Sequence, residues 1–122
     1  MRIAGLGFRD SATLPSLRAA LGLVEAAGGP ATALATLPAK AEVAVLRQLA
    51  EERGLAVLAV PVRGIATPTH SARVMALHGT GSMAEAAALA AAGPGAILTV
   101  ARISAPDGMA TCAMATHKGT QP

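Results

Sequence analysis

The sequence predicts an α/β fold, specifically a three-layer α/β/α domain with a mixed, partly parallel sheet of about five strands. In the first half of the chain, short apolar runs alternate with segments of helical periodicity, a pattern typical of parallel strands joined by crossover helices. In the second half, two apolar runs flank the turn SAPDG at residues 104–108, which indicates an antiparallel hairpin. The length of 122 residues favours a single domain spanning residues 1–122, with residues 117–122 as a frayed tail.

The first half contains three predicted strands and two predicted helices. The apolar run RIAGLG predicts a strand over residues 2–7. From residue 11 onward, Leu14, Leu17, Leu21 and Val24 recur at helical spacing, and the glycine pair at 28–29 ends that helix. The patterns that follow predict a strand over 31–36, a helix over 37–54 and a strand over 55–62.

The second half begins with residues 63–78, which we interpret as a loop with a short helix up to residue 77. A helix made almost wholly of alanine then starts at Met83, and strands follow over 96–103 and 110–115. Because the alanine helix has hardly any polar face, we expect it to be buried on more than one side, by the sheet and, as an open alternative, by a second subunit.

Composition narrows the classes of function. Ten Lys and Arg against seven Asp and Glu give a net charge of +3, and this excess is scattered along the chain. Without a basic stripe or aromatic platforms, nucleic-acid binding is not expected, so the charge indicates either a small polyanionic ligand or ordinary surface charge. The apolar stretches are too short to cross a membrane.

We expect a cytoplasmic protein, since the N-terminus lacks a signal-peptide pattern and the single Cys112 has no partner for an internal disulfide. The three histidines, His70, His78 and His117, have no metal-ligand spacing. We therefore expect neither a metal nor another cofactor.

The first candidate site lies in the loop after the first strand. In α/β sheets, ligands collect at the carboxyl ends of parallel strands, where the strand-to-helix loops converge. Gly7 allows close approach of the backbone, and Arg9 offers a cationic fork suited to a carboxylate or phosphate. The alternative is a tight turn with a solvated arginine.

The second candidate site lies in LPAKAE, where Pro38 suits the first turn of a helix and places Lys40 near its N-terminus, an unfavourable position for a cation. Glu42 is in line with the apolar Val45, Leu46 and Leu49, so its carboxylate is expected to point inward. Lys40 and Glu42 are therefore either an acid–base pair at a cleft or a structural ion pair at the rim of the core.

The third candidate is HGTGSMAE at the start of the alanine helix. Ser82 and Glu85 have the spacing of a capping box, in which the carboxylate reaches back to the cap residue. No lysine follows Gly81, so the pattern is not a nucleotide phosphate loop. The backbone N–H groups from Gly81 to Met83 could still bind a carboxylate. Glu85 is either only a cap residue or also a contact of the ligand.

The segments GLGFR, LPAKAE, TPTHSARV, GTGSMAEAAALAAAG and ATCAMA, in this order, resemble the family formed by the cobalamin-biosynthesis protein CobE and the C-terminal domain of CbiG. The likeness covers nearly the whole chain. The chain departs from the family pattern at Phe8, where a cysteine usually precedes the arginine.

The resemblance implies a role in making the corrin ring of cobalamin, and it leaves three hypotheses open. The first is a protein that binds a precorrin or corrinoid intermediate through Arg9, Lys40, Arg63 and the 81–83 amides. The second is a CbiG-like hydrolase that opens a ring lactone of a cobalt-precorrin and releases acetaldehyde, with Glu42 or Glu85 as base and Lys40 or Arg9 stabilising negative charge. The third is a docking module for other corrin-pathway enzymes. The region that precedes this domain in CbiG is not part of the sequence, so we rank binding ahead of hydrolysis.

Overall fold

The computed structural model describes residues 1–69, 71, 74–75 and 82–117, and these form a mixed five-stranded sheet in the order β3-β2-β1-β5-β4. The predicted fold class is confirmed. The elements are β1 (Arg2–Phe8), α1 (Leu14–Gly28), β2 (Ala33–Thr36), the one-turn 3₁₀ helix η1 (Pro38–Lys40), α2 (Ala44–Arg53), β3 (Val57–Ala59), α4 (Met83–Ala92), β4 (Ala96–Ser104) and β5 (Ala110–His117).

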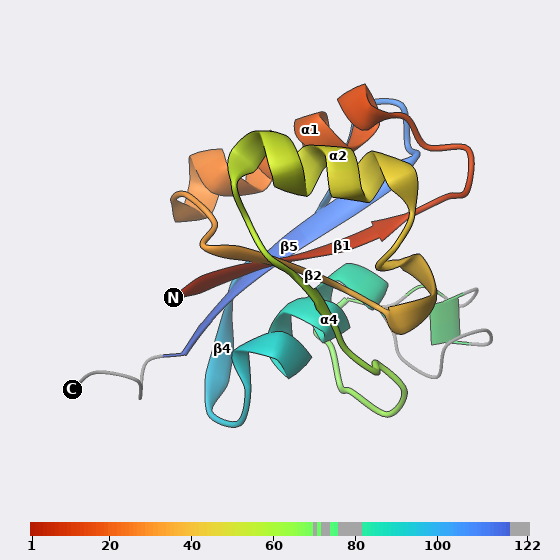
Figure 1. The fold of residues 1–122 in the computed structure, drawn as a ribbon. Coiled ribbons are helices and arrows are strands. Elements are labelled where there is room, and N and C mark those ends of the chain that lie inside the picture. The colour runs from red at the N-terminus through yellow and green to blue at the C-terminus, as the bar shows by residue number, and fades with distance from the viewer. Residues whose placement is uncertain (70, 72–73, 76–81, 118–122) are drawn as a thin grey trace.

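The sheet is parallel in its first part and antiparallel in its second, as the sequence predicts. β1 pairs in parallel with β2, and β2 with β3, whereas β5 runs antiparallel to both β1 and β4. Figure 1 shows α1 and α2 covering one face of the sheet and α4 covering the other. This arrangement brings the ends of β1 and β2 and the start of α4 to the same edge.

Two apolar clusters fill the spaces between the layers. On one face, α1 and α2 bury branched side chains such as Leu17, Leu21 and Leu46 against the sheet. On the other face, the alanines of α4 pack with Ile3 of β1, Ala35 of β2 and Ala115 of β5. Gly5 and the alanines of α4 let the helix lie so close to β1 that a Cβ atom at Gly5 would be 2.0 Å from the carbonyl oxygen of Ala84. The small-residue composition thus sets the separation of the layers.

The predicted burial of α4 on more than one side is confirmed. The five consecutive residues 84–88 are all buried, although they point in different directions around the helix. Leu89, Ala90 and Ala91 are only partly buried, and a second subunit over this face stays a prediction. Among the described residues, each helix is too short or too polar to cross a membrane.

Two predicted elements are wrong in their extent. The helix expected over 37–54 is divided into η1 and α2, with Val43 in an extended conformation at the N-terminal cap of α2. Contacts of Lys40 with Asp10 and Phe8 hold the segment in a single 3₁₀ turn. The strand expected over 55–62 is shortened to β3, which lies at an edge of the sheet and pairs only with β2 in the part of the chain described here.

The ends of two other predictions fall partly outside the described residues. Of the loop and short helix expected over 63–78, the structure describes 63–69, 71 and 74–75, with Val74 and Met75 in helical conformation. The predicted tail over 117–122 begins too early, because His117 is the last residue of β5 and its Nε2 contacts the carbonyl oxygen of Pro94. Residues 118–122 lie outside the described residues.

Candidate functional site

A pocket of about 580 Å³ opens at the carboxyl ends of β1 and β2. Its floor and rim come from the loop after β1, from η1, from the start of α4, from β4 and from the hairpin between β4 and β5. The strand-to-helix loops converge here as expected for parallel strands. The side chains that carry charge or hydroxyl groups into its lining are Arg9, Asp10, Ser11, Lys40, Ser71, Ser82, Arg102 and Thr111.

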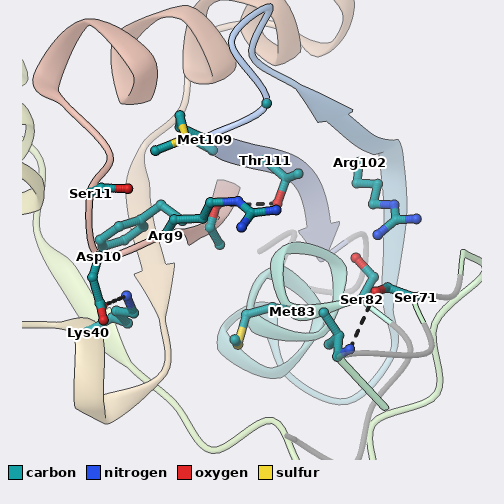
Figure 2. A pocket seen from close by; sticks show the side chains of 15 residues that line it. Arg9, Asp10, Ser11, Lys40, Ser71, Ser82, Met83, Arg102, Met109 and Thr111 are labelled. Carbon is teal, nitrogen blue, oxygen red and sulfur yellow. Dashed lines mark hydrogen bonds and ion pairs between the residues drawn. The ribbon is translucent and has the colours of Figure 1, made fainter. Parts of the chain in front are cut away.

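Arg9 lies in the middle of this pocket. Its backbone N–H donates to the carbonyl oxygen of Met109 at 3.0 Å, which ties the loop after β1 to the hairpin. Figure 2 shows its side chain extending across the pocket toward Thr111. Gly7 lets β1 pack closely against β5 and the start of α4, because a Cβ atom at this position would lie 3.1 Å from Thr111 Oγ1 and 3.2 Å from Met83 Cβ. Gly7 and Arg9 therefore both line the pocket.

Lys40 lies at one end of the pocket, where Phe8 and Asp10 fix its ammonium group. Lys40 Nζ is 2.5 Å from Asp10 Oδ1 and 4.9 Å from the centroid of the Phe8 ring. The lysine side chain is 19% exposed, whereas that of Asp10 is 99% exposed. The hydrogen bond from Lys40 and its positive charge lower the pKa of the Asp10 carboxyl. The unfavourable helix N-terminus expected for Lys40 does not arise, since Lys40 ends a 3₁₀ turn.

Glu42 lies apart from these residues, and its predicted inward orientation is wrong. Its side chain is 82% exposed and its Oε2 is 2.6 Å from Arg47 Nη2, so it pairs with Arg47 and not with Lys40. The helical stripe that predicted an inward carboxylate begins only at Ala44, because α2 starts two residues after Glu42. Its role as a base stays a prediction, at a position outside the lining of the pocket.

The start of α4 confirms half of the predicted capping box. Ser82 is buried and lines the pocket, and its Oγ accepts the backbone N–H of Glu85 at 3.4 Å. The carboxylate of Glu85 does not return to the cap, because other donors occupy it. Oε1 accepts the backbone N–H and the hydroxyl of Thr69 at 3.0 and 2.9 Å, and Oε2 accepts the backbone N–H of Arg102 at 2.9 Å.

Asp10 and Arg102 are the charged residues of the pocket that were not predicted from the sequence. Arg102 comes from an unexpected part of the sheet. It lies in β4, where the register against β5 shifts twice, between Leu98 and Val100 and again between Val100 and Ile103. The shifts move β4 side chains between the two faces of the sheet: Leu98 packs with α4, but Val100 and Ile103 pack with α1 and α2. The only signal in the sequence was a charged residue within an apolar run.

The two remaining candidates are Arg63 and Gly81. Arg63 follows β3 but is not among the residues that line the cavity, and Gly81 lies outside the described residues. Cys112 is buried in the core, and this burial raises the pKa of its thiol. Over the part of the chain that the structure describes, no three His, Cys, Asp or Glu side chains are grouped as metal ligands.

The pocket is cationic with apolar walls. Arg9, Lys40 and Arg102 come from three separate segments, and Asp10 is the one carboxylate among the described lining residues. Figure 2 shows Lys40 at one end, Arg102 near Ser82 at the other and Arg9 between them. Phe8, Met83 and Met109 supply apolar surface. The arrangement suits a ligand that carries several separated carboxylates on an apolar body.

The fold and this pocket define a small α/β protein with a cationic pocket at the edge of its parallel strands. The family model for the cobalamin synthesis G C-terminus matches residues 2–115, and the chain belongs to this family of cobalamin biosynthesis proteins. None of the curated proteins compared with the chain matches it significantly.

Two solved structures are similar over nearly their whole length. CobE, a protein from the cobalamin (vitamin B12) biosynthetic pathway, is 33% identical with a TM-score of 0.79, and the match covers 94% of this chain and 89% of CobE. The cobalamin biosynthesis protein ChiG from Agrobacterium tumefaciens str. C58 is 34% identical with a TM-score of 0.75, covering 97% of this chain and 99% of ChiG.

Proposed function

We propose that the protein binds a corrin-ring intermediate of cobalamin biosynthesis in the pocket at the carboxyl ends of β1 and β2. The observation that carries this proposal is the convergence of Arg9, Lys40 and Arg102 on one cavity. Corrin intermediates bear acetate and propionate groups around an apolar ring. Separated cations and apolar walls match both parts of such a ligand.

Within this pocket, the Asp10 carboxylate forms an ion pair with Lys40 when no ligand is bound. Because Asp10 is almost fully exposed, a ligand carboxylate can replace it on the lysine at little cost in burial. Phe8 keeps the ammonium in place during the exchange through its cation–π contact. The residue that distinguishes this chain from the family pattern thus supports the Lys40 side of the site.

Hydrolysis of a ring lactone is less well supported by this geometry. Glu42 pairs with Arg47 away from the pocket, and Glu85 is fully buried with both carboxylate oxygens accepting hydrogen bonds. Neither expected base faces the cavity. We therefore favour binding, and we include the cytoplasmic location and contacts with a second copy or with other corrin-pathway enzymes as parts of the same proposal.

The proposal is tested by titrating the purified protein into hydrogenobyrinic acid and recording the visible spectrum. We expect a spectral shift at micromolar protein. Replacing Lys40→Gln should weaken binding about tenfold, since one charge-assisted contact is lost. Asp10→Asn should strengthen it by removing the competing carboxylate.

The matched control is Arg18→Gln, which removes a cation paired with Glu52 on an outer helix surface and should leave the affinity unchanged. Absence of any shift with the wild-type protein would contradict the proposal. If Lys40→Gln and Arg18→Gln lose the same affinity, the loss comes from the change in net charge and not from a contact with Lys40.

A further inference from the structure

Glu85 is the fully buried carboxylate of α4, and it joins three parts of the molecule. Its exposed fraction is 0%. One oxygen accepts two hydrogen bonds from Thr69, in the segment that leads to the pocket-lining Ser71, and the other accepts the backbone N–H of Arg102 in β4. The side chain therefore holds together two walls of the pocket without reaching the cavity.

Burying a carboxylate is costly unless its oxygens are fully used. At Glu85, three hydrogen bonds satisfy the two oxygens, and its position in the first turn of α4 lets the positive end of the helix dipole stabilise the charge. A neutral apolar residue would fill the same space without this cost. The Glu85 carboxylate therefore does more than fill space, and its hydrogen-bond partners show which parts of the fold it joins.

Arg102 has a special need for an acceptor at its backbone. It lies within the second register shift of β4, where two residues, Ala101 and Arg102, lie opposite the single Ala113 of β5, so the ladder is interrupted there. A buried backbone N–H without a partner is costly, and Glu85 Oε2 provides that partner at 2.9 Å. The bond fixes the bulged backbone that directs the Arg102 side chain to the pocket.

We propose that Glu85 is a positioning residue, which acts on an anionic ligand through Arg102 by fixing the β4 bulge and the Thr69 segment against α4. This inference rests on the proposed function for the nature of the ligand. It replaces the expectation that Glu85 itself contacts the ligand. Arg102 contacts the carboxylate, and Glu85 sets where Arg102 lies.

The test is a double-mutant cycle with Glu85→Gln and Arg102→Ala, measured with two probes, hydrogenobyrinic acid and benzenehexacarboxylate. A glutamine amide has a single acceptor oxygen, so it cannot serve both Thr69 and Arg102. We expect each single variant to weaken binding roughly tenfold. In the Arg102→Ala background, Glu85→Gln should add less than about a twofold loss, because the group through which it acts is gone.

The control is Glu25→Gln, which changes a mostly buried carboxylate of the same type in α1. Glu25 also accepts a backbone N–H, from Ala31, but it does not line the pocket. Its variant should lose stability and keep its affinity for both probes. Glu85→Asp, which keeps the charge but is shorter, repeats the cycle if Glu85→Gln does not fold.

A second readout needs no ligand. Amide hydrogen exchange, followed by NMR, should be faster at Arg102 or Thr69 in Glu85→Gln than in the wild type, and unchanged there in Glu25→Gln. Unchanged exchange at both amides, or equal binding losses in the two backgrounds of the cycle, would overturn the inference.

The two proposals fail in different ways. If the wild type binds benzenehexacarboxylate but not hydrogenobyrinic acid, the corrin proposal fails, and the cycle measured with benzenehexacarboxylate still decides the role of Glu85. If the wild type binds neither probe, there is no anion for Arg102 to contact, and the positioning role fails as well.

Discussion

Glu25 shows how a single side chain makes the stability of this protein depend on pH. Its Oε2 accepts hydrogen bonds from Arg53 Nη2 at 2.6 Å and from the backbone N–H of Ala31 at 2.8 Å. Burial raises the pKa of this carboxyl, but the hydrogen bonds from Arg53 and Ala31 and the charge of Arg53 outweigh it, and the net pKa lies below 4.5. The folded protein therefore stabilises the ionised form of Glu25 more than the unfolded chain does.

Because the folded pKa is the lower one, this stabilisation is present above the ordinary pKa and is lost as the pH falls through the folded value. We expect Glu25→Gln to lower the free energy of unfolding by about 2 kcal/mol at neutral pH. Its difference from the wild type should shrink as the pH falls below 4.5. Urea denaturation of both proteins at a series of pH values measures this difference, and a constant gap down to low pH would contradict the assignment.

At the scale of elements, the contact between β1 and α4 places the start of the helix at the pocket. A Cβ atom at Gly5 would lie 2.0 Å from the carbonyl oxygen of Ala84 and 2.6 Å from the backbone nitrogen of Ala88. Both atoms belong to the helix backbone, so the whole of α4 would have to move. Such a movement would also displace Ser82 and Met83, which line the pocket.

We expect Gly5→Ala to destabilise the protein by about 3 kcal/mol because of this overpacking. Gly22→Ala is the matched control, since Gly22 lies in α1 with nothing within 4 Å of the added Cβ atom, and it should raise stability by about 0.5–1 kcal/mol. Thermal or urea unfolding measures both. If the two substitutions change the stability by similar amounts, the close contact between β1 and α4 does not depend on the glycine at position 5.

At the scale of the whole molecule, the charge distribution favours anions. The net charge is +3, and the pocket gathers Arg9, Lys40 and Arg102 from segments far apart in the sequence. Exposed charges interact with a ligand over a Debye length of about 10 Å at 0.1 M salt, and this range shortens as salt increases. Binding of a polycarboxylate to this pocket should therefore depend on salt.

We expect the affinity for hydrogenobyrinic acid to fall about tenfold or more when NaCl is raised from roughly 0.05 to 0.5 M. A corrin whose carboxylates are converted to amides should show little dependence, because only apolar contacts and neutral hydrogen bonds remain. Spectroscopic titrations at several salt concentrations compare the two ligands. Equal salt dependence for both would argue against contacts with the carboxylates.

By itself, the sequence determined the layers, the mixed sheet and the meeting of Gly7, Arg9 and Lys40 at one edge, whereas Arg63, also predicted as a contact, does not line the pocket. These follow from local periodicity and from the rule that the carboxyl ends of parallel strands share an edge. The capping hydroxyl of Ser82 was also predictable, because it depends on residues three positions apart.

The tertiary structure alone decided the partners of the charged groups. Lys40 pairs with Asp10, thirty residues away, and Glu85 with Thr69 and Arg102, at separations of sixteen and seventeen residues. The side chain of Glu42 was predicted to point inward from a helical pattern, but the helix begins only at Ala44. Arg102 reaches the pocket because of the register shifts between β4 and β5. Such contacts depend on how strands and helices are placed against one another, which periodicity along the chain does not specify.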